Sequence, residues 1–182
     1  MPQPLSFQLT LYPQPVLRKV AEPIRAFDAE LAATVRAMFD LMYESKGVGL
    51  AAPQVGLRQR ILVLNETGDP AQVEHEIALV NPSILERYGQ TTQYEEGCLS
   101  FPGIYAEISR PERVKVRASG VDGVESVREY EGFVSRIVQH EYDHLEGVLL
   151  VDRMSAADRL RHKVALEELK ARYQRATAAG GR

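Results

Sequence analysis

The sequence contains a single cysteine, Cys98, among 182 residues, so a disulfide bond within the chain is excluded. A protein without disulfides suits a reducing compartment. No apolar run approaches the roughly 20 residues that a membrane-spanning helix needs, and the first residues lack the basic and then apolar pattern of a secretion signal. We therefore expect a cytoplasmic protein without a membrane segment.

A large excess of charge of one sign is also absent, because the formal net charge is −3. This balance gives no reason to expect DNA as a partner. Hydrophobic residues make up 45% of the chain and charged residues 26%, which are values of a globular protein and exclude bulk disorder. The length fits one domain, which we expect over residues 1–182, with a frayed tail at 176–182.

The pattern of hydrophobic residues predicts helices near both ends of the chain and strands between them. Helices are expected at about 28–47, 131–147 and from 155 onward. Strands are expected at 60–65, 77–81 and 114–118, and turns at 67–70, 88–89 and 122–123. The first 25 residues contain several prolines and are expected to form an extended arm on the surface. This order indicates an α+β fold rather than a doubly wound sheet.

The strongest local signal is the sequence His-Glu-Tyr-Asp-His at 140–144. Two histidines four residues apart project from the same face of a helix, because one turn takes about 3.6 residues. His140 and His144 can then bind one metal ion, and Glu141 can accept a proton from a metal-bound water. The same five-residue pattern also arises by chance, with histidines that only pack or face solvent.

A metal site of this kind needs a third protein ligand, and several residues compete for that position. A third histidine ten residues after the first is excluded, because that position is Leu150. Glu167 and Glu168 are available on a later helix, but they lie in a basic segment with no apolar wall. Cys98 is the remaining candidate, since a thiolate binds zinc or ferrous iron well. A lone cysteine is nevertheless more often an inert, buried side chain.

Two further segments carry recognisable patterns. Residues 47–54 read Gly-Val-Gly-Leu-Ala-Ala-Pro-Gln, a backbone of small residues that a substrate can approach closely. Residues 96–100 read Glu-Gly-Cys-Leu-Ser. Together with Gln-His-Glu-Tyr-Asp-His at 139–144, these segments resemble the three signature motifs of the peptide deformylase family, in the same order. The resemblance covers nearly the whole chain.

The resemblance implies a metal-dependent hydrolase that removes the N-formyl group from the first methionine of newly made polypeptides. Its metal ligands would be Cys98, His140 and His144. Glu141 would be the general base and later the acid, while Gln54 and the backbone N–H of Leu99 would stabilise the oxyanion. The family typically uses Fe²⁺, and Zn²⁺, Ni²⁺ or Co²⁺ are the other candidates for the metal.

The resemblance also implies which residues bind the substrate. Gly49, Glu96 and Gly97 would hold the substrate's main chain or support the site. The pocket for the methionine side chain would be lined by Val48, Phe133 and Ile137. The implied fold is α+β, with three short antiparallel sheets around a central metal-bearing helix and further helices near both ends of the chain.

Three residues close to these motifs have roles that the sequence leaves open. Phe101 stands where an aliphatic residue is expected, and it could narrow the mouth of the pocket. Tyr105 falls where some relatives carry an arginine near the substrate backbone. Arg136 lies one turn before His140, and we interpret it as part of an exposed helix face rather than as a partner of the site.

The C-terminal segment 153–182 differs from the rest of the chain in its charge. It carries eight Lys or Arg residues and three Asp or Glu residues, whereas the remainder is acidic. Members of the family commonly dock near the ribosomal exit tunnel through this helix, so the resemblance implies the ribosome as a partner. A solvated helix face is the other explanation.

Two other functions remain compatible with the residues alone. A zinc endopeptidase would use the same two histidines with another third ligand. A domain that only binds formylated peptides or the ribosome would not need Glu141 as a base.

Overall fold

The computed structural model of the chain describes residues 5–180. Its strands form one antiparallel sheet in the order β1-β2-β3-β4-β5. Their bounds are Gly49–Ala51 for β1, Ile61–Leu64 for β2, Ile77–Gly97 for β3, Tyr105–Ser119 for β4 and Glu125–Glu131 for β5. The family resemblance implied three short sheets. Here the strands join into one, because the start of β3 pairs with β2 and the rest of β3 pairs with β4.

The helices follow the predicted order. Their bounds are Ala29–Glu44 for α1, Gly132–Leu145 for α2, Leu150–Arg153 for α3, Ala156–Arg161 for α4 and Lys163–Gly180 for α5, and the 3-10 helices are Pro15–Arg18 (η1), Ala52–Val55 (η2) and Val73–His75 (η3). Asp28 caps α1 by accepting a hydrogen bond from the N–H of Leu31 at 3.0 Å. Ser155 caps α4 in the same way, with the N–H of Asp158 as donor. Within residues 5–180, no helix combines the length and apolar character needed to cross a membrane.

The end of α5 includes residues 176–180, where a frayed tail is expected, and the fraying itself stays a prediction. Helix α5 continues through Gly180, while residues 181 and 182 lie outside the described part of the chain. Ala176 and Ala178 explain this continuation, because alanine has the highest helix propensity.

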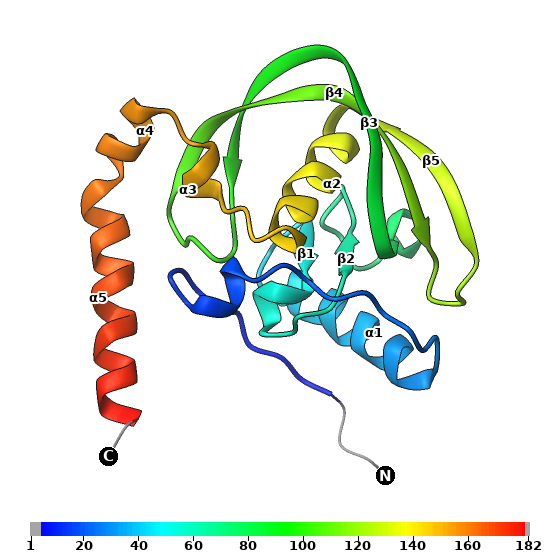
Figure 1. Cartoon of the computed structure of the whole chain (residues 1–182), viewed down its shortest axis with the longest axis horizontal. Helices are drawn as coiled ribbons and strands as arrows, with labels where there is room; N and C mark the ends of the chain where they lie inside the picture. The colour runs from blue at the N-terminus through cyan, green and yellow to red at the C-terminus, as the bar shows by residue number, and fades with distance from the viewer. Residues whose placement is uncertain (1–4, 181–182) are drawn as a thin grey trace.

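The largest difference from the predicted elements lies in β3 and β4. The strand predicted at 77–81 runs on to Gly97, and the turn predicted at Tyr88-Gly89 is an irregularity inside it, with a register shift between Tyr88 and Thr91. Gly89 has a φ of +82°, which glycine adopts without strain at a bulge. The two long strands arch over α2 in Figure 1. Strand β5 was not predicted, and most of its residues are exposed.

The short strand β2 separates the two main helices. All four of its residues are buried, and its side chains alternate between the two faces of the sheet. Leu62 and Leu64 pack in a core cluster with Ile137 of α2. Ile61 and Val63 pack in a second cluster with residues of α1. Helix α2 packs against β1 and β2 on one side and against β4 on the other, and it lies at the centre of the molecule (Figure 1).

The N-terminal arm and helix α5 pack against the outside of this core. The arm is extended as predicted except at the 3-10 helix η1, and its backbone N–H groups at Thr10 and Tyr12 donate to the carbonyls of Gln54 and Ser100 at 2.7 and 3.0 Å. A third core cluster joins α5 to the segment between β3 and β4. Its buried members include Leu17, Phe101, Ile104, Leu149, Met154, Leu166 and Leu169.

Candidate metal centre

Three side chains from separate parts of the chain meet beside α2. The Sγ of Cys98, just after β3, lies 3.3 Å from Nε2 of His144 on α2. His140 lies one turn earlier on the same helix face, and one ligand atom from each of these three residues lies within 4.8 Å of the others. The structure therefore brings together the three residues that the sequence predicted as metal ligands.

A carboxylate behind the site orients His140. Nδ1 of His140 lies 3.0 Å from Oε2 of Glu96. Because an ionised carboxylate only accepts hydrogen bonds, Nδ1 carries the hydrogen, and in the neutral form of His140 that can bind a metal the lone pair is on Nε2. Partners of this kind fix the tautomer and orientation of metal-binding histidines. Glu96 thus supports the site from behind rather than entering the pocket as a free side chain.

Two buried arginines, Arg110 and Arg136, donate hydrogen bonds to Glu96. Arg110 of β4 contacts both carboxylate oxygens of Glu96, at 2.7 and 3.0 Å. Arg110 also donates to Asp143 of α2 at 2.9 Å. The carboxylate of Asp143 accepts a further hydrogen bond from Arg153 at the end of α3. Glu96, Arg110 and Asp143 are each at most 6% exposed. Such charges are stable in a protein interior only when they are paired and hydrogen-bonded, as they are here.

The interpretation of Arg136 as part of an exposed face is wrong. Arg136 is 8% exposed, and its guanidinium donates to Oε1 of Glu96 at 2.7 Å and to the carbonyl of Ile108 at 3.0 Å. The reason is that β3 and β4 extend over α2 and cover the helix face that the sequence suggested was open to solvent. Arg136 therefore neutralises Glu96 together with Arg110.

Burial and charge pull the pKa values of the two glutamates in opposite directions. Burial raises the pKa of Glu141 to about 7, although His140 and Arg110 oppose the increase. Burial also acts to raise the pKa of Glu96, but the hydrogen bonds from His140 and Arg110 outweigh it and lower the value to about 2. Glu96 is therefore a permanent carboxylate near neutral pH, whereas Glu141 can both accept and release a proton.

The two histidines also shift in opposite directions. Burial acts to lower the pKa of His140, yet its contacts with Cys98 and Glu96 outweigh this and raise the pKa well above the ordinary value. Burial lowers the pKa of His144, and the nearby His140 adds to the decrease. These shifts favour a positive charge on His140, which contacts both Cys98 and Glu96.

The donor set fits a divalent metal ion. One thiolate and two imidazoles suit zinc or ferrous iron, and the open side of the site faces a pocket. Oε2 of Glu141 is buried without a hydrogen-bond partner among residues 5–180. A buried carboxylate oxygen of this kind needs a donor, which a water in the site would supply.

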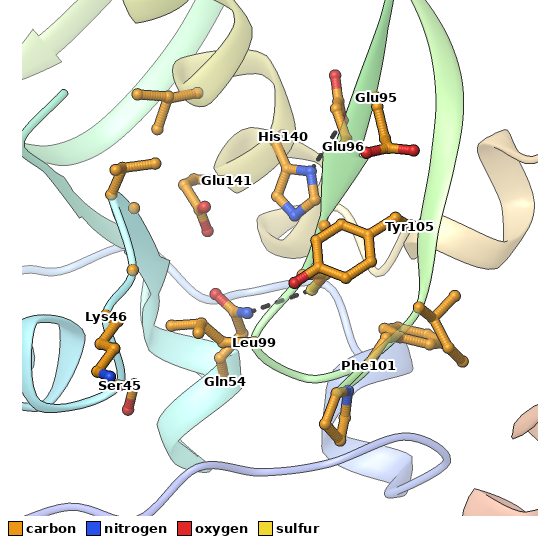
Figure 2. A pocket seen from close by; sticks show the side chains of 18 of the residues that line it. Ser45, Lys46, Gln54, Glu95, Glu96, Leu99, Phe101, Tyr105, His140 and Glu141 are labelled. Carbon is orange, nitrogen blue, oxygen red and sulfur yellow. Dashed lines mark hydrogen bonds and ion pairs between the residues drawn. The ribbon is translucent and has the colours of Figure 1, made fainter.

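The pocket in front of the three ligands has a volume of about 600 Å³. Most of the residues that the sequence assigned to the reaction or the substrate line it, and Figure 2 shows several of their side chains around the cavity. The lining includes Val48, Gly49, Gln54, Glu96, Gly97, Cys98, Leu99, Phe133, Ile137, His140 and Glu141. His144 is the exception, because it lies 1% exposed behind this surface.

The glycine at position 49 is needed for close approach. A Cβ placed on Gly49 would lie 2.6 Å from Oε1 of Glu141 and 2.6 Å from Cγ2 of Ile137. A larger residue at this position would therefore displace the side chains of Glu141 and Ile137. Glu141 is thus held between its own helix and the backbone of β1.

Phe101 does not stand free at the pocket mouth. Its side chain is fully buried, stacks on Tyr12 at a centroid distance of 4.8 Å, and belongs to the core cluster that includes α5. It therefore supports the pocket wall from behind. The alternative ligands Glu167 and Glu168 lie on α5 and form ion pairs with Lys170 and Arg172.

Sequence reasoning missed Arg110 and Asp143 as partners of the site. A signal for Arg110 exists in the alternation of β4, where Ala106, Ile108 and Arg110 are all buried on one face. The predicted strand begins at residue 114, after Arg110, whereas β4 begins at Tyr105.

Comparison with known proteins agrees with this geometry. The family model described as polypeptide deformylase matches residues 6–160. The peptide deformylase of Thermotoga neapolitana is 47% identical over 154 residues, which cover 85% of this chain and 90% of that protein. The chloroplastic/mitochondrial peptide deformylase 1B of Arabidopsis thaliana is 46% identical over 91% of this chain, which spans 60% of that protein.

A solved structure has the same fold. The crystal structure of peptide deformylase from Plasmodium falciparum superposes with a TM-score of 0.90 at 41% identity, over 92% of this chain and 97% of that one. The fold, the ordered motifs and the grouped Cys and His side chains point to one assignment. The chain belongs to the peptide deformylase family of metal-dependent hydrolases, which remove the N-formyl group from newly made polypeptides.

Proposed function

We propose that Cys98, His140 and His144 hold the catalytic metal of this deformylase, and that Glu141 moves the protons of the reaction. The observation that carries the proposal is the convergence of the three ligand atoms within 4.8 Å of one another, beside the unpartnered Oε2 of Glu141. A divalent ion bound there would lower the pKa of a water and polarise the formyl oxygen.

Glu141 serves as base first and as acid afterwards. Burial places its pKa at about 7, so its carboxylate can take a proton from the attacking water near neutral pH. The same carboxyl group then returns the proton to the leaving amine. Cleavage of the formyl C–N bond releases formate and the peptide with a free amino group.

Gln54 is placed to stabilise the negative charge that develops on the formyl oxygen. The N–H of Ala51 donates to Oε1 of Gln54 at 2.8 Å, which orients the amide so that Nε2 faces the site. Nε2 lies 3.6 Å from Sγ of Cys98 and 3.3 Å from Oγ of Ser100. The backbone N–H of Leu99 is the second donor in this proposal, and each such donor is worth about 3–4 kcal/mol in the transition state.

The pocket beside these groups takes the methionine side chain in our proposal. Val48, Phe133 and Ile137 supply apolar surface, and Phe133 leans against Tyr94 with ring centroids 6.0 Å apart. Gly49 and Gly97 leave the backbone of β1 and the end of β3 open to the main chain of the peptide. Glu96 contributes from behind, through His140.

We propose Fe²⁺ as the native metal, with Zn²⁺, Ni²⁺ and Co²⁺ as ions that the same donor set can accept. We also propose the ribosome as a docking partner through the basic C-terminal helix, and the cytoplasm as the location. The plant relatives are named as organelle proteins, so the location rests on the single cysteine of this chain rather than on those relatives.

The proposed function is tested with formyl-Met-Ala-Ser and protein that is purified and loaded with Fe²⁺ without oxygen. The expected products are formate and Met-Ala-Ser, with no cleavage of internal peptide bonds. The Glu141→Gln variant should bind the metal but release formate about 100- to 10,000-fold more slowly. Normal turnover in this metal-loaded variant would remove Glu141 from the reaction.

A further inference from the structure

The buried carboxylate of Asp143 lies next to the metal ligands, and two arginines from different elements contact it. Asp143 is on α2, one residue before His144. Its Oδ2 accepts hydrogen bonds from Arg110 of β4 at 2.9 Å and from Arg153 of α3 at 3.0 Å. Its Oδ1 accepts from Arg153 at 2.6 Å, and among residues 5–180 no other side chain donates to this oxygen. Arg153 therefore supplies most of the hydrogen bonds that stabilise this buried charge.

A continuous series of hydrogen bonds leads from Arg153 to His140. Arg110, which contacts Asp143, also donates to both oxygens of Glu96, at 2.7 and 3.0 Å. Glu96 accepts in turn from Nδ1 of His140 at 3.0 Å. The three groups between the two ends are all charged and buried, and the position of one such group influences the next.

Loss of Arg153 would change how Arg110 is shared between the two carboxylates. Oδ1 of Asp143 would lose its donor, which is costly for a buried charge. Arg110 already contacts Asp143, and it can move toward the free oxygen only by weakening its contacts with Glu96. The hydrogen bond that orients His140 would weaken as a result, and with it the placement of the metal-binding nitrogen.

Helix α3 holds Arg153 in place. Asp152 accepts a hydrogen bond from the N–H of Leu149 at 2.8 Å and pairs with Arg18 of η1. Leu150 is buried in the same core cluster as residues of α5, and Figure 1 shows α3 between α2 and α5. Arg153 thus connects the C-terminal part of the chain to the groups behind the metal ligands.

We propose that Arg153 is a positioning residue of the metal centre, which orients His140 through the buried charged groups between them. The proposal rests on the proposed function, in which His140 binds the metal. The alternative is that Arg153 only fastens α3 to α2 and stabilises the fold. The two explanations differ at the metal, because a contact that only stabilises the fold leaves the arrangement of the ligands unchanged.

The test measures the dissociation constant of zinc, by competition with a chromogenic chelator, and the visible absorption spectrum of the cobalt-loaded protein. Arg153→Ala should bind zinc about tenfold more weakly, the lower end of the effect of residues that orient a metal-binding histidine. Its cobalt bands should change, because they report the arrangement of the ligands. Arg153→Lys should recover part of the affinity, since lysine keeps the charge but lacks the planar fork that contacts both oxygens.

Arg161→Ala is the matched control. Arg161 also lies in the C-terminal segment and pairs with a buried aspartate, Asp158, at 3.3 Å. The other side-chain partner of Asp158 is Ser155, which is not part of the metal centre. This variant should keep the zinc affinity and the cobalt spectrum of the wild type. Arg153→Gln removes the charge but keeps most of the stem, and it replaces Arg153→Ala if that variant does not fold.

Two results would overturn the proposal. One is an unchanged zinc affinity and cobalt spectrum in the folded neutral variant of Arg153, even if the metal-free protein unfolds more easily. The other is an equal loss of zinc affinity in Arg161→Ala. If the cobalt-loaded wild type showed no charge-transfer band from sulfur, the metal centre of the proposed function would itself be wrong.

Discussion

At the scale of single residues, the site depends on the charge of Glu96. This carboxylate receives hydrogen bonds from His140, Arg110 and Arg136, and it is 6% exposed. The metal ligands themselves could be predicted because they lie in short motifs. The arginines could not, because residues 14 and 40 positions from Glu96 meet it only after β3 and β4 have folded over α2.

Glu96→Gln should destabilise the protein in a pH-dependent way. The pKa of Glu96 is about 2 in the folded chain and 4.5 in the reference state, so its charge contributes stability above about pH 4.5 that is lost as the pH falls toward 2. The difference corresponds to roughly 3 kcal/mol. The free energy of unfolding of metal-free wild type and variant should differ most near pH 6 and converge toward pH 2–3.

Metal-free protein is used in that comparison so that loss of a bound ion at low pH makes no contribution. A stability gap that stays constant from pH 6 to pH 2 would show that Glu96 acts through packing rather than through its charge.

At the scale of elements, the short strand β1 sets the distance between the sheet and α2. Helices α1 and α2 were predictable because their apolar residues repeat with the period of a helix. The length of β3 was not predictable, because its residues 83–95 are mostly exposed and show no alternation of buried and exposed side chains. Pairing with a neighbouring strand, which the local sequence does not encode, holds this part in place.

Gly49→Ala should impair catalysis more than folding. The added methyl group would lie 2.6 Å from Oε1 of Glu141, so the carboxylate must move away. A displacement of this size near the reacting atoms lowers kcat by about 100-fold, while overpacking costs about 1–3 kcal/mol of stability. Formate release and thermal unfolding of the metal-loaded variant measure the two effects.

Gly120→Ala is the matched control. Its added methyl group would lie 2.6 Å from Oδ1 of Asp122, an equally close contact, at a residue that does not line the pocket. If both variants retained wild-type kcat, the backbone of β1 would have no part in placing Glu141.

At the scale of the whole molecule, the acidic body and the basic C-terminal segment are separated in space. Helix α5 stands at the edge of the molecule (Figure 1) and is joined to it through buried residues such as Leu166 and Leu169. Arg159, Lys163 and Arg175 are exposed and form no ion pair within residues 5–180. The charge asymmetry was visible in the sequence, but the sequence could not show which cations remain unpaired.

Replacement of Arg159, Lys163 and Arg175 by alanine should weaken co-sedimentation with ribosomes. Each lost phosphate contact should reduce the slope of log affinity against log salt by about 1. Activity on a short formyl peptide should stay unchanged, because these side chains do not line the pocket.

The control replaces Arg113, Lys115 and Arg117, three cations on β4 that pair with acidic residues of β5. This triple variant removes the same number of positive charges from the acidic body. Equal weakening of ribosome binding in both triple variants would rule out α4 and α5 as the docking surface.

The most direct test of the whole account is the X-ray absorption spectrum of the zinc-loaded protein. Convergence of Cys98, His140 and His144 on one ion predicts one sulfur at about 2.3 Å and two imidazole nitrogens at about 2.0–2.1 Å. The sulfur contribution should disappear in Cys98→Ser. A spectrum of the wild type without sulfur in the first shell would contradict the proposed metal centre and the mechanism built on it.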